Sequence, residues 1–65
     1  MPWHSTHERE ELLIVVQGGV IAEVRRGRVQ RLALRAGDTL FLPRRTEHQV
    51  HNPGRRPAGY VYITG

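Results

Sequence analysis

Histidines are the side chains of this sequence with the clearest capacity for chemistry. There are four in 65 residues. His4 and His7 precede an acidic cluster that ends at Glu11, and His48 follows Pro43 by five residues. Imidazole and carboxylate groups are the ligands that divalent transition metals take where no cysteine is present. The pattern therefore predicts a metal site.

Two of these candidates need a turn between them if they are to meet. On a straight strand His7 and Glu11 would lie roughly 13 Å apart, at about 3.3 Å per residue. Ligands of one metal each lie about 2.0–2.2 Å from the ion. If both residues bind the same ion, the chain must turn within residues 8–10. His51 alternates out of phase with His48, so we expect it to face solvent.

Short strands must position these side chains, because turn residues divide the chain into pieces too short for helices. Between these breaks the apolar residues alternate with a period of two. We expect strands near residues 12–17, 20–25, 28–35, 39–42, 47–51 and 58–64, with a shorter one at 3–7. This spacing is typical of an antiparallel sandwich or barrel. Gly18 and Gly19 favour a two-residue hairpin between the first two of these longer strands.

The predicted strands are too few to cover one another completely. The segment 12–17 is apolar on both faces, as in a strand covered on both sides, whereas 28–35 carries three arginines and must contact water. A second chain lying against 12–17, or against the last strand with its apolar residues 60–63, would cover the remainder. We therefore expect a homodimer.

The length and the absence of cysteine set further limits. We expect one domain over residues 1–65, and a core of this size rarely contributes more than roughly 3–5 kcal/mol on its own. Without cysteine the chain has no disulfides, zinc ribbons or thiol catalysis. A metal or a partner subunit is left to stabilise the fold.

Charge and hydropathy indicate the compartment and exclude two kinds of partner. The longest apolar run, residues 12–16, is far shorter than the ~20 residues of a membrane span, so we expect no membrane partner. No signal-like segment opens the chain, so we expect a cytoplasmic protein. All ten basic residues are arginine and the net charge is +4, a usage typical of a GC-rich bacterial genome. Aromatic residues make up only 6%, so we expect no nucleic-acid partner.

The second half of the chain resembles the second motif of the cupin superfamily, G-x5-P-x-G-x2-H-x3-N. Gly37, Pro43, His48 and Asn52 all fall at the required spacings. The glycine of P-x-G is replaced by Arg45, which adopts a positive φ less readily. Four matches at fixed spacing are a specific signal.

The first half resembles the other cupin motif, G-x5-H-x-H-x(3,4)-E-x6-G. His7, Glu11 and Gly18 match its second histidine, its acid and its closing glycine. The first histidine would be residue 5, which is Ser5. His4 takes that role if the longer spacing applies or if a bulge before His7 turns its side chain inward.

The resemblance implies an all-β fold, a small antiparallel double-stranded β-helix (a cupin-type barrel or jelly roll) of about six or seven short strands, without the usual N-terminal strands. It implies one divalent transition metal, Fe, Mn, Ni or Zn, held by His7, Glu11 and His48 with His4 as the candidate fourth ligand. Their imidazoles and carboxylate would leave coordination positions open to water or substrate.

The ligand that the resemblance implies is a small molecule, and its expected charge is negative. Arg45 stands three residues before His48, where a guanidinium could pair with a carboxylate or phosphate. Tyr62 shares one face of the last strand with Tyr60, and its hydroxyl could point into the ligand cavity.

The reaction stays open, because members of this superfamily include oxygenases, isomerases, decarboxylases and binding modules, and fold does not choose among them. One hypothesis is a metal-dependent oxygenase or isomerase. The alternative is a non-catalytic binding or structural module, or a decayed metal site, that acts as a dimer. We assign no catalytic residue.

Overall fold

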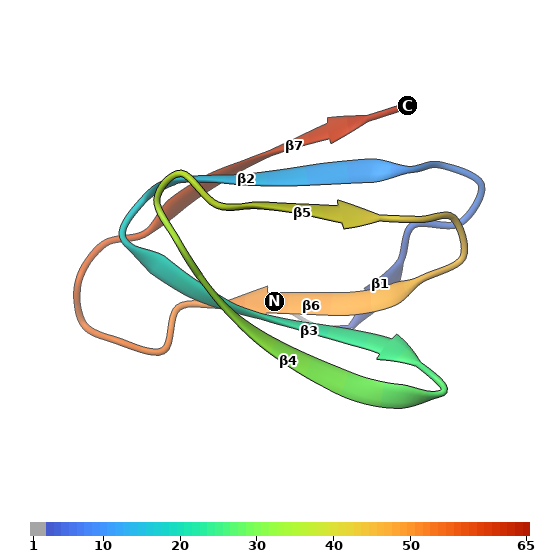
Figure 1. Cartoon of the computed structure of the whole chain (residues 1–65), viewed down its shortest axis with the longest axis horizontal. Coiled ribbons are helices and arrows are strands. Elements are labelled where there is room, and N and C mark those ends of the chain that lie inside the picture. The colour runs from blue at the N-terminus through green and yellow to red at the C-terminus, as the bar shows by residue number, and fades with distance from the viewer. Residues whose placement is uncertain (1–2) are drawn as a thin grey trace.

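The computed structural model describes residues 3–65, which form seven short strands (Figure 1). The strands are β1 (His4–Ser5), β2 (Glu11–Gln17), β3 (Gly19–Arg26), β4 (Arg28–Arg35), β5 (Thr39–Leu42), β6 (Glu47–His51) and β7 (Gly59–Thr64). Each predicted strand is present with ends within two residues of those expected. Within residues 3–65 the chain forms no helix long and apolar enough to cross a membrane.

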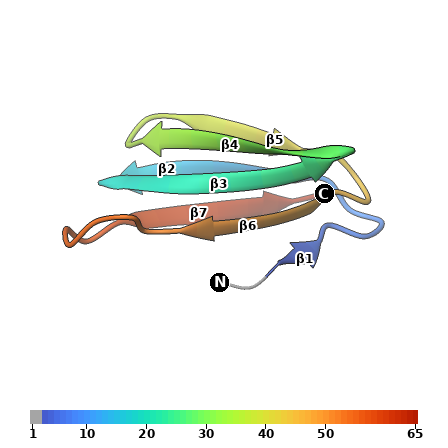
Figure 2. The same cartoon turned by 90° about the horizontal axis from the view of Figure 1, so that it is seen from below.

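The strands make two antiparallel sheets. One has the order β1-β6-β3-β4 and the other the order β5-β2-β7. Figure 1 separates them, with β7, β2 and β5 above β6, β3 and β4, and Figure 2, seen from below, shows the four-stranded sheet face-on in front of the three-stranded one. The all-β antiparallel fold expected from the sequence is therefore confirmed.

The core lies between the two sheets, and the alternation of side chains explains its composition. Successive residues of a strand point to opposite faces, so one residue in two enters the interior. The fully buried cluster contains residues from both sheets: Leu13, Val15, Val20, Ala22 and Val50. On β4 only Leu32 and Leu34 pack against this cluster, and its arginines are exposed, as expected for an edge strand.

The connection at Gly18 and Gly19 joins the two sheets, so the predicted hairpin is wrong. β2 pairs with β5 and β7, and β3 pairs with β4 and β6. The physical reason is that β2, apolar on both faces, is the central strand of its sheet and has no edge left for β3. Gly18 has φ +69°, and a Cβ there would collide with the carbonyl oxygen of Pro57.

Hydrogen bonds between two turns hold β1 against β6. The Thr6 hydroxyl donates to the carbonyl of Pro43 at 2.7 Å and accepts from the Thr46 amide at 3.1 Å. The Thr6 amide donates to the Thr46 carbonyl at 3.2 Å, and the Arg45 amide donates to the His7 carbonyl at 2.8 Å. Both threonines are buried, so these bonds are shielded from water and set the positions of the neighbouring side chains.

Candidate metal site

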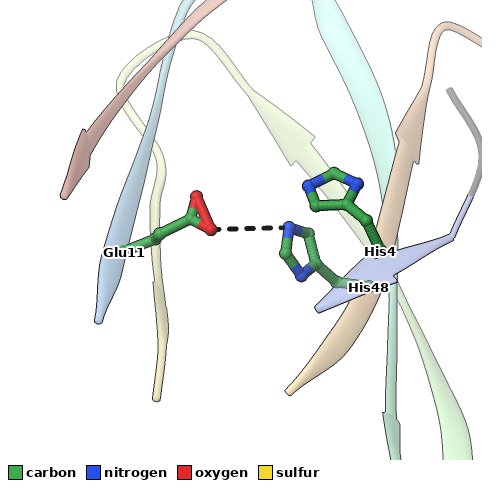
Figure 3. A group of neighbouring side chains, drawn as sticks. All are labelled: His4, Glu11 and His48. Carbon is green, nitrogen blue, oxygen red and sulfur yellow. Dashed lines mark ion pairs between the residues drawn. The ribbon is translucent and has the colours of Figure 1, made fainter. Parts of the chain in front are cut away.

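Three side chains of the predicted set converge at one end of the sandwich. His4 comes from β1, His48 from β6 and Glu11 from the start of β2, and one ligand atom of each lies within 4.8 Å of the others (Figure 3). β1 and β6 belong to the four-stranded sheet and β2 to the other. The group therefore bridges the two sheets.

His48 is the buried member of the group, with 1% of its surface exposed. Its Nδ1 atom lies 3.1 Å from the Thr46 carbonyl oxygen. Because a carbonyl only accepts, Nδ1 donates, and in the neutral ring Nε2 then carries a free lone pair. Nε2 is buried and has no hydrogen-bond partner. A backbone carbonyl that fixes the tautomer in this way is the usual outer partner of a metal-binding histidine.

Glu11 faces that unpaired nitrogen. Its Oε1 atom lies 3.9 Å from His48 Nε2, and its side chain is only 12% exposed. This separation is too long for a hydrogen bond. Two ligand atoms each about 2.1 Å from one ion can lie up to about 4.2 Å apart. The distance therefore fits a shared ion better than a direct bond.

His4 joins the group through the pairing of β1 with β6. It stands opposite His48 in the strand register, and the two ring centroids are 4.3 Å apart at an interplanar angle of 64°. Ser5 is paired with Glu47 and lies on the other face of the strand. The side chain at residue 4 therefore lies beside His48, in the place that the motif spacing would give to residue 5.

The structure does not bring His7 into this group. His7 lies in the turn after β1, is exposed and has φ 55°. Its amide donates to the Ser5 hydroxyl at 3.0 Å. The turn expected between His7 and Glu11 is present, since the Arg9 amide donates to the Thr6 carbonyl. In this turn, however, the His7 side chain is exposed.

Arg45 lies at the same end of the sandwich but outside the group. It is exposed with φ 56°, in the left-handed region that the glycine of the motif would favour. Its guanidinium forms an exposed ion pair with Glu8 at 3.3 Å. Such pairs are weak, so the guanidinium is free to exchange partners.

Tyr62 stands beside the group, and its hydroxyl is buried without a hydrogen-bond partner. Its ring centroid is 6.2 Å from that of His48. Burial first, and then the neighbouring Tyr60 and Glu11, raise the pKa of Tyr62 to about 12. At neutral pH the phenol is therefore a protonated donor.

A groove of about 660 Å³ lies elsewhere, at the start of β3 and the end of β4. Three arginines line it, Arg35, Arg55 and Arg56, together with Asn52. Asn52, the last residue of the second motif, donates to the Arg56 carbonyl and accepts from the Gly54 amide, so it shapes the loop. No ligand of the candidate metal group lines this groove.

Comparison with known proteins gives a family match over nearly the whole chain. A family model with the description "Cupin domain" matches residues 1–64, which include all three members of the group. No curated protein and no solved structure matches the chain. The match thus identifies a family without assigning a reaction.

Proposed function

This chain belongs to the cupin domain family, and on that premise we propose that it binds one divalent transition metal through His4, Glu11 and His48 and a small anionic ligand at that metal. The observation that carries the proposal is the buried Nε2 atom of His48. The Thr46 carbonyl sets the tautomer of this ring through Nδ1, and Nε2 itself has no hydrogen-bond partner. A buried polar atom without a partner costs about 1–3 kcal/mol, and a bound ion removes that cost.

The donor set indicates which metals fit. Two imidazoles and one carboxylate suit Fe(II) and accept Mn, Ni or Zn, and three protein ligands leave coordination positions open. When bound, such an ion polarises an oxygen atom of its ligand. His4 is the exposed member of the group, which leaves a route to the site from solvent.

Two side chains support an anionic ligand. The Tyr62 hydroxyl is a protonated donor, buried next to His48 and without a partner among residues 3–65. Arg45 adds a positive charge at the same end and is engaged only in an exposed pair with Glu8. We infer that Tyr62 donates to the ligand and that Arg45 attracts it from solution.

The test compares two histidines of the same strand. Metal content and Zn²⁺ affinity are measured for the native chain, for His48→Ala and for His51→Ala, whose side chain lies on the outer face opposite Ile21. We expect His48→Ala to weaken binding by about 100-fold or more, and His51→Ala to leave it unchanged. Equal affinities in the two variants would refute the proposal.

The ligand is tested separately, with acetate as the probe anion on the Co²⁺-loaded protein. We expect Tyr62→Phe to weaken acetate binding by about 5–10-fold, the value of one hydrogen bond, without changing the Co²⁺ affinity. Tyr60→Phe is the control. If Tyr62→Phe binds acetate as well as the native protein, Tyr62 is not a ligand-binding residue.

A structural role for the metal is the second candidate, because the ligands come from both sheets. An ion at this position would join the two layers of a chain whose own core is small. Chelation would then lower the melting temperature sharply, while acetate would not change the Co²⁺ spectrum. A spectral change on adding acetate favours the ligand-binding function.

A further inference from the structure

The outer face of the three-stranded sheet is apolar and open. Four of the five most exposed large apolar side chains among residues 3–65 belong to β2, β5 and β7: Val16, Phe41, Val61 and Ile63. The register places Leu12 between Phe41 and Ile63, on the same face. Every strand that the structure describes belongs to one of the two sheets, so no further strand covers this face.

No charged side chain interrupts this outer face. It consists of Leu12, Ile14, Val16, Thr39, Phe41, Val61 and Ile63. The one charged residue in these strands, Glu11, points inward to the candidate metal group. None of the ten arginines lies in β2, β5 or β7.

The other sheet provides an internal comparison, because its outer face carries paired polar groups. Gln49 donates to Glu23 at 2.6 Å, and Arg25 pairs with Glu47 at 3.5 Å. Arg31 stands opposite Glu23 in the register. One sheet of this chain therefore has the surface of a solvated sheet, and the other has the surface of a buried one.

We propose that the outer face of β5-β2-β7 is the interface of a homodimer, in which a second copy of the chain packs sheet against sheet. Two uncharged apolar faces are complementary to each other, as a two-fold interface requires. None of the arginines lies on this face. Two chains of net charge +4 can therefore bring these faces together without placing like charges opposite each other. A charged partner would find no counterpart on this face.

The area of the face is sufficient. From their exposed fractions, its four most exposed side chains leave roughly 350 Å² of apolar surface in contact with water, in the range of patches that are often functional. A specific interface buries about 800 Å² per partner, a little over half of it apolar. With the half-buried Leu12 and Ile14, the face supplies an area of that order.

Two matched valines test the proposal. Val61 on β7 is 48% exposed and Val29 on β4 is 44% exposed, and each lies on an edge strand of a different sheet. Sedimentation equilibrium of the native chain should give the mass of two chains. We expect Val61→Glu to raise the dimer dissociation constant by about tenfold or more, because it buries an unpaired charge, and Val29→Glu to change it less than twofold.

Methyl NMR on dilution separates dissociation from misfolding. We expect the Ile63 and Val61 methyl signals of the native chain to shift as the dimer dissociates, while Val29 does not shift. A native chain that is monomeric at all concentrations overturns the proposal, whatever else covers the face. An equal effect of Val61→Glu and Val29→Glu overturns it as well. Metal affinity is measured on the same samples, so a failure here is distinguishable from a failure of the metal site.

Discussion

The Nε2 atom of His48 lies 3.9 Å from Oε1 of Glu11, across the gap between the two sheets. His48 is paired through β6 with β1 and β3, while Glu11 is paired through β2 with β5 and β7. No hydrogen bond joins the two side chains directly at this distance. Their approach is therefore a consequence of how the two sheets pack.

Replacing Glu11 by glutamine tests the contribution of its charge. Glu11→Gln keeps the shape of the side chain but removes the negative charge that attracts a cation, so we expect Co²⁺ affinity to fall by about tenfold or more. The measurement is a Co²⁺ titration followed by absorption. Glu10→Gln, which alters an exposed neighbour, should leave the affinity unchanged. Equal affinities in both variants would exclude Glu11 as a ligand.

His4 and His7 offer a direct comparison between geometry and motif spacing. The His4 ring is next to His48, whereas His7 is exposed in a turn outside the group. We therefore expect His4→Ala to weaken Zn²⁺ binding by about tenfold or more, and His7→Ala to leave it nearly unchanged. Calorimetric titration of both variants decides between them. The reverse order of effects would mean that the turn rearranges when metal binds.

The raised pKa of Tyr62 makes the metal-free protein sensitive to alkali. The value is about 12 in the folded chain and 10.0 for an unperturbed tyrosine, so folding favours the neutral phenol. This contribution is fully present below pH 10 and is lost as the pH rises to about 12. Because the side chain is partly exposed, we expect a loss of no more than about 1 kcal/mol.

Urea unfolding at rising pH measures this loss, and ultraviolet absorbance of tyrosinate reports the titration directly. Tyr62→Phe should remove the tyrosinate absorbance that appears near pH 12 and reduce the alkaline destabilisation. If Tyr62 titrates near the ordinary tyrosine value of 10.0, its hydroxyl is not held in an apolar environment.

Substitutions at two glycines with positive φ distinguish the cost of backbone strain from the cost of a steric clash. Gly27 has φ +80° and open space around it, whereas at Gly18, with φ +69°, a Cβ would meet the Pro57 carbonyl. We expect Gly27→Ala to cost about 1–2 kcal/mol and Gly18→Ala at least ~1 kcal/mol more. Urea denaturation of the two variants gives the difference. Equal losses would mean that the chain near Pro57 moves aside at little cost.

Much of the local structure was predictable from the order of the residues. Alternation of apolar and polar residues has a strict period of two in a strand, and glycine and proline mark the turns, so the strand positions follow from short-range information. The motif spacings around Glu11 and His48 likewise identified two of the three members of the group. Alternation also placed Tyr62 and Tyr60 on one face of the last strand, and in the structure the Tyr62 hydroxyl is buried.

The sequence alone thus determined the class of fold, the strands and the residue types available for a metal. Only the tertiary structure decided that Gly18 leads from one sheet to the other and that His4, instead of His7, faces His48. The physical reason is that pairing partners are chosen by burial of apolar faces between residues distant in sequence. A turn motif or a local spacing contains no information about which strand lies across the core.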